Sequence, residues 1–250
     1  MKKFENKIAL ITGSSRGIGK SIALDLAKEG AFVIIHYTNN KPSAEQTLSE
    51  VNAIGGKGEL VRANFSDRNS INDLFAQVDK ILSNKKIDFL INNAGILEKG
   101  SLENVSEEQF DDMFNVNVKS VFFITKHFIS IMNNGGRIIN ISSNLSKRPR
   151  QELIAYSMTK AAIDNFTITL ASTLGSRQIT VNSVAPGATD TDMNKERFKD
   201  PIVKESVGNM NALKRVGTPN DITKVVAFLC SEDGGWITGQ YIEASGGAGL

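Results

Sequence analysis

Short apolar runs rich in β-forming residues alternate with longer amphipathic stretches along the chain, and this alternation restricts the fold more than any other feature. The runs expected to form strands are residues 8–12, 32–36, 57–62, 89–92, 137–142, 180–185 and 240–244. The stretches with helical spacing are residues 19–29, 44–54, 70–83, 107–132, 156–174 and 221–229, with Ser66 or Asp67 expected to cap the third. Apolar strands joined through helices run parallel and are buried on both faces. The pattern therefore predicts a parallel seven-stranded sheet with helices on both faces.

Composition and charge narrow the class of protein further. The 250 residues are 40% hydrophobic and 22% charged, and they contain no repeat or low-complexity linker, so we expect one domain over residues 1–250. A formal net charge of +2 is too small to predict a nucleic acid or a membrane as partner. The apolar run 8–11 is too short for a signal peptide, so a cytoplasmic protein is expected. Two histidines and one cysteine do not make a usual zinc site, and no metal is predicted.

Residues 189–210 form the most polar stretch of the chain. This stretch contains Asn194, Lys195, Lys199, Asp200 and Pro201 and carries no clear strand or helix pattern. Two interpretations fit it, a mobile lid over a binding site and a solvated excursion. We include it in the domain as a substrate lid.

Three glycines follow the first expected strand and open the first helix. Gly13, Gly17 and Gly19 have the spacing Gly-x-x-x-Gly-x-Gly. Small residues let the backbone approach an anion, and a helix N-terminus offers free N–H groups and the positive end of its dipole. The spacing differs from the usual Gly-x-Gly-x-x-Gly, but its place after strand one is that of a dinucleotide-binding turn. The fold class predicted is thus α/β, a Rossmann-type doubly wound parallel sheet.

The end of the second expected strand indicates which dinucleotide is bound. An acidic residue usually holds the ribose 2′-hydroxyl of NAD at this place, but residues 36–41 contain no carboxylate. Arg16 and Lys41 could supply positive charge to a 2′-phosphate, so NADP(H) is favoured over NAD(H). The alternative is that both are solvated surface charges.

The same glycine segment also fits another enzyme class. Residues 13–17 match Gly-x-Ser-x-Gly, the nucleophile elbow of α/β hydrolases. A hydrolase needs a histidine late in the chain, after an acidic residue. The histidines present, His36 and His127, lie in the second strand and in a long helical stretch, which disfavours this interpretation.

Tyr156 and Lys160 lie four residues apart at the start of an expected helix, so their side chains share one face. A free phenol has a pKa near ~10, too high for easy proton exchange at neutral pH. A nearby ammonium stabilises the phenolate and lowers that pKa, which makes the pair suitable for general acid–base catalysis. By itself, a tyrosine and a lysine four residues apart on a helix more often pack and contact solvent without any catalytic role.

Taken together, the motifs resemble the short-chain dehydrogenase/reductase family over essentially the whole chain. The matching segments are residues 12–19, 92–95 and 186–187, with Asn117, Ser143, Tyr156 and Lys160. One departure is Asn64-Phe65, where the family usually has Asp followed by Val or Leu. An asparagine amide can still form a hydrogen bond with adenine.

The resemblance implies a role for each matched residue. Tyr156 is the general acid in reduction and the base in oxidation, and Lys160 lowers its pKa and holds the nicotinamide ribose. Ser143 binds the substrate oxygen, with Ser142 as the alternative, and Asn117 holds a water that links Lys160 to solvent. The residues assigned to cofactor binding are Gly13, Ser15, Arg16, Gly17, Ile18, Gly19, Tyr37, Asn39, Asn64, Phe65, Asn93, Ala94, Gly95, Tyr156, Lys160, Pro186, Gly187, Thr189 and Thr191.

The resemblance is greatest to 3-oxoacyl-(acyl carrier protein) reductases, which implies reduction of a carbonyl substrate such as a 3-oxoacyl thioester. Arg177 stands where one carrier-binding arginine is expected, whereas Asn134 replaces a second. The basic loop 146–152 should border the substrate pocket. Its charges either attract an anionic substrate, or are solvated, or contact another subunit. The alternatives kept are a non-catalytic NADP(H)-binding regulator and a short-chain alcohol or sugar dehydrogenase that uses NAD. The last strand and the long helices imply a homotetramer.

Overall fold

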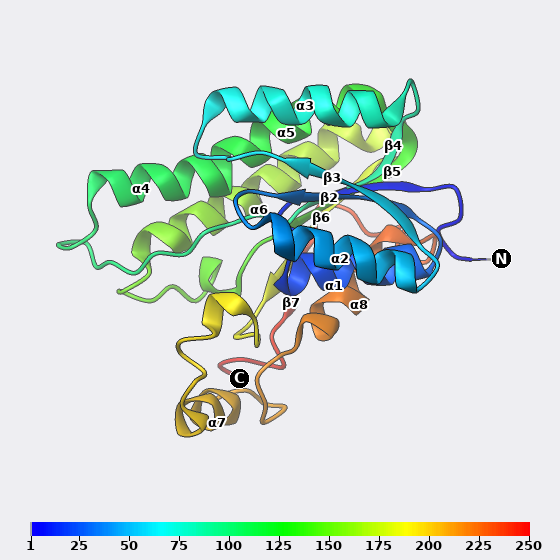
Figure 1. Cartoon of the computed structure of the whole chain (residues 1–250). Helices are drawn as coiled ribbons and strands as arrows, with labels where there is room; N and C mark the ends of the chain where they lie inside the picture. Colours follow the sequence, from blue (N-terminus) through cyan, green and yellow to red (C-terminus); the bar gives the residue numbers. More distant parts are fainter. Residues whose placement is uncertain (1) are drawn as a thin grey trace.

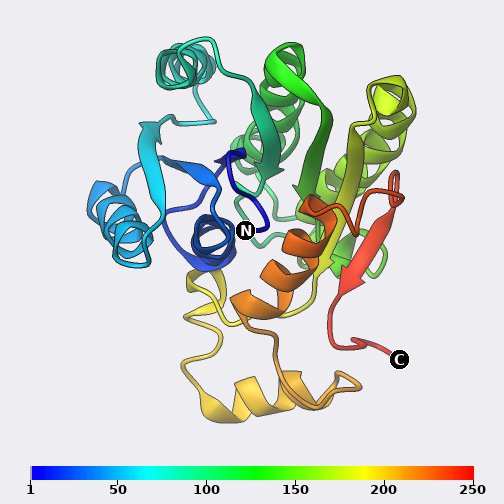
Figure 2. The same cartoon turned by 90° about the vertical axis from the view of Figure 1, so that its right-hand side faces the viewer.

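The computed structural model describes residues 2–250, and its centre is one twisted sheet flanked by helices (Figures 1 and 2). All strands run parallel, in the order β3-β2-β1-β4-β5-β6-β7. The strands are β1 (Ile8–Ile11), β2 (Phe32–Tyr37), β3 (Lys57–Arg62), β4 (Ile87–Asn92), β5 (Met132–Ile141), β6 (Thr180–Pro186) and β7 (Tyr241–Ala244). The predicted seven-stranded parallel sheet is confirmed.

Helices cover both faces of the sheet (Figure 2). The helices are α1 (Gly17–Lys28), α2 (Lys41–Ala53), α3 (Arg68–Leu82), α4 (Glu107–Phe114), α5 (Ser120–Phe128), α6 (Ile154–Leu174), α7 (Pro201–Asn209) and α8 (Pro219–Cys230). Helices α1, α2 and α8 pack on one face, and α3, α5 and α6 pack on the other. Strand side chains alternate between the two layers. In β1, Leu10 joins the α3/α5/α6 core, while Ala9 and Ile11 join the opposite core.

The stretch 107–132, expected as one long helix, is divided in the structure. Helix α4 ends at Phe114, a π-helical turn η1 (Asn115–Lys119) follows, and α5 then leads into a short 3₁₀ turn, η2 (Ile129–Ile131). Strand β5 starts at Met132, earlier than the expected residue 137, and Met132 pairs with Ile87. The wider π turn contains the buried Asn117, and π turns of this kind are frequent at functional sites. Periodicity alone does not reveal such a turn, because both sides of it are helical.

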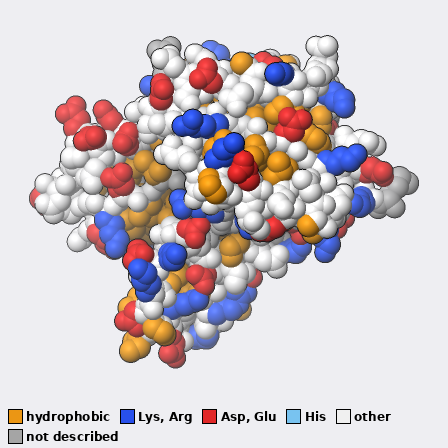
Figure 3. Space-filling model, in the orientation of Figure 1, with side chains coloured by type: hydrophobic (Ala, Val, Ile, Leu, Met, Phe, Trp, Pro, Cys, Tyr) orange, Lys and Arg blue, Asp and Glu red, His pale blue; other side chains and the backbone are white. Residues whose placement is uncertain are grey.

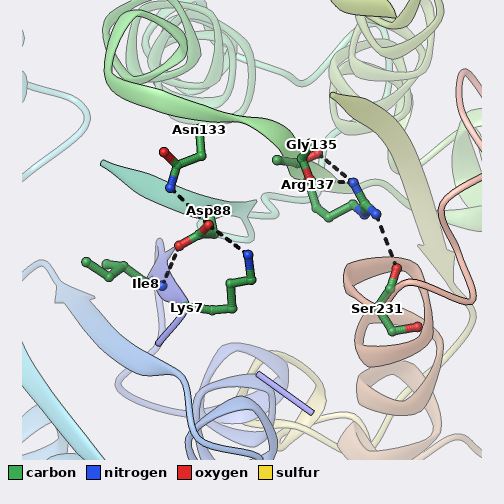
Figure 4. Close-up of polar contacts among 8 residues, drawn as sticks. Lys7, Ile8, Asp88, Asn133, Gly135, Arg137 and Ser231 are labelled. Atoms are coloured by element: carbon green, nitrogen blue, oxygen red, sulfur yellow. Dashed lines mark hydrogen bonds and ion pairs between the residues drawn. The ribbon is translucent and has the colours of Figure 1, made fainter. Parts of the chain in front are cut away.

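A buried carboxylate joins three strands at the amino end of the sheet (Figure 4). Asp88 of β4 accepts hydrogen bonds from the Ile8 amide at 2.9 Å, from Lys7 Nζ at 3.2 Å and from Asn133 Nδ2 at 3.0 Å. Nearby, Arg137 of β5 donates to the Gly135 carbonyl at 2.6 Å and to the Ser231 carbonyl at 3.4 Å. Because the acidic side chain and its partners come from β1, β4 and β5, they fix the alignment of the central strands far from the edge where the strands end.

Residues 189–210 contain a helix that the sequence pattern did not predict. Helix α7 starts at Pro201, directly after the capping residue Asp200, whose carboxylate accepts from the Ile202 amide at 2.8 Å. Proline at the first helical position and aspartate before it are a recognised helix start, so the signal was present but was outweighed by the polar composition. The segment extends below the sheet in Figure 1, and hydrophobic side chains are exposed at that tip in Figure 3.

Within residues 2–250, none of the helices is both long enough and apolar enough to cross a bilayer.

Candidate active site

The predicted site residues gather at the carboxyl edge of the sheet. The glycine turn follows β1, Asn93 and Gly95 follow β4, Ser143 follows β5, and Gly187 follows β6. The strand order reverses between β1 and β4, which come together in the middle of the sheet. In open parallel sheets a ligand cleft forms outside the strand ends at this reversal point.

Glycine is required at two positions of the turn after β1. Gly13 has φ +63°, and a Cβ added there would lie 2.8 Å from the Ala94 Cα. A Cβ on Gly19 would lie 2.5 Å from both Asn93 Nδ2 and the Gly13 carbonyl oxygen. The turn is therefore packed against the segment that follows β4, with no space for a side chain between them.

Asn93 and Thr12 bind the glycine turn to the end of β4. The Asn93 side-chain amide donates to the carbonyls of Thr12 and Gly13, both at 2.9 Å. In return, the Thr12 hydroxyl accepts from the Asn93 amide at 2.9 Å and from the Ala94 amide at 3.0 Å. The predicted cofactor residue Asn93 thus shapes the turn through its side chain.

His36 supports the same turn from β2, a role that the sequence analysis missed. Its Nδ1 accepts from the Gly13 amide at 2.9 Å, and its Nε2 lies 3.1 Å from the Ala63 carbonyl, which makes it the donor there. The ring is fully buried and stacks on Phe65 at 4.3 Å. Burial lowers the pKa of His36 to about 4, so the imidazole is neutral. No signal in one sequence separates such a histidine from an ordinary core residue.

These contacts also count against a hydrolase. Both ring nitrogens of His36 are engaged with backbone groups, so neither is available as a base for Ser15. His127 stacks on Phe75 at 3.9 Å, between α3 and α5 on the opposite helical layer. Within residues 2–250 the nucleophile elbow therefore lacks a histidine partner.

The N-terminus of α1 fits the phosphates of a dinucleotide. Its capping position, Arg16, makes no side-chain cap hydrogen bond, and its first turn contains no acidic residue. By contrast, α4 starts with a capping box formed by Ser106 and Gln109. Uncapped N–H groups at the positive end of a helix dipole favour an anion. The glycine turn and the start of α1 therefore fit the phosphates of the dinucleotide that the glycine motif implies.

A surface cavity of about 450 Å³ lies beside this helix start, between α1 and α2. Arg16 lines it and is 65% exposed, and its Nε lies 3.8 Å from a carboxylate oxygen of Asp192. Lys41, the other cation considered for a 2′-phosphate, instead pairs with Glu45 at 3.3 Å and is not among the lining residues. Arg16 is thus the better placed of the two cations.

Tyr156, Ser143 and Lys160 come together where α6 begins. All three are less than a tenth exposed, and Lys160 Nζ lies 5.6 Å from the centre of the Tyr156 ring. The Ser143 side chain is near enough to the phenol to lower its pKa. The Ser142 hydroxyl instead lies 3.4 Å from the Lys160 carbonyl. The geometry therefore places Ser143, and not its neighbour, beside Tyr156.

The electrostatics of Tyr156 differ from the sequence-based expectation. Burial raises the pKa of the phenol to about 12, and the contact with Ser143 opposes this shift only in part. The expectation of a lowered pKa is therefore not met in this structure, because burial would move the phenolate out of water. Burial also lowers the pKa of Lys160 to about 8, against the charge of Asp164.

Lys160 and Asn117 meet behind the tyrosine. Lys160 Nζ donates to the Ile141 carbonyl at 2.9 Å, and a Cβ added to Gly95 would lie near both Lys160 Nζ and Asn117 Oδ1. The Asn117 amide donates to the Ile96 carbonyl at 2.9 Å and to Thr159 Oγ1 at 3.2 Å, and its oxygen accepts from the Ile96 amide at 2.9 Å. One N–H group of this side chain thus holds the chain after β4, and the other holds α6 through Thr159.

The remaining predicted cofactor residues border the same edge. Thr191 lies against Gly17, and Thr189 is buried with its hydroxyl donating to the Gly187 carbonyl at 2.9 Å. Tyr37 and Phe65 are buried, with the Phe65 ring used in packing on His36. Ile18 lies in the first turn of α1. The other members lie at or just after the ends of β1, β2, β3, β4 and β6, namely Ser15, Asn39, Asn64, Ala94 and Pro186.

Comparison with known proteins gives matches along nearly the entire chain. A family model described as Enoyl-(Acyl carrier protein) reductase matches residues 13–249. Versicolorin reductase stcU of Emericella nidulans is 37% identical, covering 98% of this chain and 97% of that protein. Short chain dehydrogenase mdpC of the same organism is 37% identical, covering 98% and 96%.

Solved structures agree with this result. Angucycline C-6 ketoreductase LanV, crystallised with bound NADP, superposes with a TM-score of 0.94 at 40% identity, covering 99% of this chain and 97% of that chain. A short chain dehydrogenase of Burkholderia cenocepacia J2315, in complex with NADP, gives a TM-score of 0.91 at 34% identity, covering 99% and 100%. The chain therefore belongs to the short-chain dehydrogenase/reductase family of oxidoreductases.

Proposed function

We propose that this protein is an NADP(H)-dependent carbonyl reductase with Tyr156 as its proton donor. The observation that carries the proposal is the buried group of Tyr156, Ser143 and Lys160 at the same sheet edge as the glycine turn. We propose further that residues 1–250 act as one domain, with 189–210 as a lid over the substrate. The exposed apolar side chains Ile202 and Met210 on and after α7 support a lid that covers an apolar ligand. A cytoplasmic location remains a prediction.

The residues at the edge divide the chemistry between them. Bound NADPH supplies the hydride for the carbonyl carbon. Ser143 holds the substrate oxygen by a hydrogen bond, and Tyr156 delivers the proton to that oxygen. Lys160 stabilises the phenolate that remains, while Asn117 holds the Ile96 backbone beside it. Because the side chain of Asn117 is already engaged, we propose that its backbone, in the π turn, holds the water of the proton relay.

The raised pKa of the phenol favours the reductive direction. With its pKa raised to about 12, Tyr156 is protonated throughout the physiological pH range. It is therefore ready to act as an acid, and proton transfer to a developing alkoxide, a stronger base than phenolate, is downhill. Oxidation needs the phenolate, which forms in quantity only at alkaline pH. We infer that the protein works chiefly as a reductase.

Replacing Arg16 by alanine is expected to raise KM for NADPH by about 10- to 100-fold. A charge-assisted hydrogen bond to a phosphate contributes about 1.5–3 kcal/mol, and ~1.4 kcal/mol corresponds to a factor of ten. NADH lacks the 2′-phosphate and serves as the internal control, with KM expected to change little. Initial rates with both cofactors measure the effect, and an equal loss for both would refute the role of Arg16.

The names of the relatives and the contacts of Arg177 bear on the class of substrate. The relatives include a versicolorin reductase and an angucycline C-6 ketoreductase, which are named for the reduction of versicolorin and of a ketone at C-6 of an angucycline. Arg177, considered for binding an acyl carrier, donates to the carbonyls of Ile129 and Met132, both at 2.6 Å, and to Asn134 at 3.1 Å. Its three nitrogens are engaged within the chain. We therefore propose a free, apolar cyclic ketone as substrate, in preference to a carrier-bound 3-oxoacyl thioester.

A cofactor and substrate panel tests the proposal. In the reductive assays, the protein is mixed with NADPH or NADH and with either fused-ring aromatic ketones or 3-oxoacyl thioesters. In the oxidative assays, it is mixed with simple alcohols and the oxidised cofactors. The nicotinamide absorbance is followed in both. We expect NADPH oxidation with the cyclic ketones. NADPH binding without turnover of any carbonyl would support the non-catalytic regulator, and turnover only with NAD(H) would support the alcohol or sugar dehydrogenase.

We propose that a second copy of the chain covers the outer faces of α5 and α6, within a homotetramer. Phe122, Phe123 and Ile168 are 47%, 42% and 58% exposed there, and Phe122 contacts Phe166 with ring centres 5.6 Å apart. Light scattering should give four times the mass of the chain. Phe122→Glu should reduce that mass while preserving the circular dichroism spectrum, because it places a charge in the buried contact. A monomeric unmodified protein would contradict this assembly.

A further inference from the structure

Asp164 is a buried carboxylate on the same face of α6 as Tyr156 and Lys160. It lies one helical turn beyond Lys160, which itself lies one turn beyond Tyr156. Residues four apart on a helix are neighbours, with Cβ atoms about 5–6 Å apart. Asp164 is 4% exposed, so it is removed from water almost completely. The sequence analysis gave it no role.

The contacts of Asp164 leave one of its oxygens without a partner. Oδ1 accepts a hydrogen bond from the Ser183 hydroxyl of β6 at 3.0 Å. Oδ2 is buried and has no hydrogen-bond partner in the part of the chain that the structure describes. A buried carboxylate is costly unless a charge or hydrogen bonds compensate it. The ammonium of Lys160, one turn away, is the compensating charge on its own helix.

We propose that Asp164 is a positioning residue that keeps the Lys160 side chain protonated beside Tyr156. This inference rests on the proposed function, in which a charged Lys160 stabilises the phenolate left after proton transfer. A neutral lysine would leave that phenolate without a cationic side chain beside it in a buried site. Asp164 touches neither the phenol nor the substrate oxygen, so it acts through Lys160.

The direction of the effect follows from the surroundings of Lys160. Burial lowers the pKa of Lys160 to about 8, and the negative charge of Asp164 raises it. Without that charge the pKa falls further, so the ammonium loses its proton within the neutral range. Well above this lower pKa the Lys160 side chain is neutral, and well below it the side chain still carries its positive charge. Activity that depends on the ammonium should therefore decline on the alkaline side.

Other titratable groups face this region from β7. Tyr241 pairs with Ser183 in the sheet register, and its hydroxyl is buried without a partner within the described chain. Burial is the main cause that raises the pKa of Tyr241, with smaller contributions from the charges of Glu243 and Asp164. Arg148 pairs with Glu243 at 2.5 Å and limits the influence of that carboxylate. Among these groups, Asp164 is the charge that acts on Lys160.

The Asp164→Asn variant tests the proposal directly, because it keeps the shape and the bond with Ser183 but removes the charge. Lysines labelled with ¹³C at Cε are titrated by NMR, with Lys160 assigned from the spectrum of a Lys160→Arg variant. We expect the pKa of Lys160 to fall by about one unit or more. An unchanged Lys160 titration would overturn the proposal. This readout needs no turnover, so it is independent of whether the proposed function is correct.

Ser183→Ala is the matched control, because it removes the hydrogen bond of Asp164 and keeps its charge. The alkaline limb of the kcat/KM profile for carbonyl reduction should move down by about one pH unit in Asp164→Asn and stay near its original position in Ser183→Ala. Equal shifts in both variants would show a merely structural role. The unmodified protein gives a further test, since Lys160 should titrate near pH 8. A titration below about 6, as for buried lysines without a carboxylate, would also refute the proposal.

Discussion

Replacing Tyr156 by phenylalanine should lower kcat for carbonyl reduction by about 10²- to 10⁴-fold and leave the Kd of NADPH nearly unchanged. A positioned general acid contributes that range of rate enhancement, and the substitution removes only the hydroxyl that donates the proton. The ring stays in the core cluster that it shares with Met113 and Ala155, so the fold should persist. Single-turnover rates measure the chemical step, and fluorescence titration measures cofactor binding.

A matched control separates loss of the acid from loss of any buried hydroxyl. Tyr241→Phe makes the same chemical change in β7, outside the residues assigned to catalysis, and it should retain most of the turnover. If the Tyr156→Phe variant still reduced the carbonyl substrate at a substantial rate, the phenol would be rejected as the proton donor. A water or another side chain would then be favoured in that role. A large loss in both variants would indicate a general effect on packing. The pair thus tests the assignment even if the rate constants are small.

Sequence patterns revealed the sheet and the position of the site for clear physical reasons. Parallel strands are buried on both faces, so they appear as apolar runs, and their carboxyl ends meet at one edge. The glycine turn and the Tyr156–Lys160 pair then had to lie at that edge, as the structure shows. Turn and helix-cap signals were weaker, and α7 was missed although Asp200 and Pro201 mark its start.

What the sequence could not show depends on long-range contacts. His36 braces Gly13 from another strand, and Ser183 holds Asp164 from another element, so neither contact leaves a local pattern. The pKa of Tyr156 is a second example. A nearby lysine is visible in the sequence, but the burial that raises the pKa to about 12 depends on the whole surrounding fold. Local spacing therefore predicts which residues lie together at the sheet edge, but not the pKa values that burial gives them.

Replacing Gly19 by alanine is expected to raise the Kd of NADPH by about 10- to 100-fold or more. The added Cβ would lie 2.5 Å from Asn93 Nδ2 and from the Gly13 carbonyl, and 2.8 Å from the Ser14 Cα. Backbone atoms on two of these sides cannot rotate away, so the turn must move and lose its bonds to Asn93. Each lost hydrogen bond to a charged phosphate costs about 1.5–3 kcal/mol, and ~1.4 kcal/mol is tenfold in affinity.

The same substitution should also lower the free energy of unfolding by about 1–3 kcal/mol, the usual cost of overpacking. Gly175→Ala is the control, because Gly175 has no heavy atom within 4 Å of an added Cβ and lies at the far end of α6. That variant should bind NADPH normally and melt near the temperature of the unmodified protein. If Gly19→Ala binds NADPH as tightly as the control, the phosphates do not lie against this turn. The cofactor site would then have to lie away from the end of β1. The cofactor-binding roles assigned to Arg16 and Thr191 would be rejected as well.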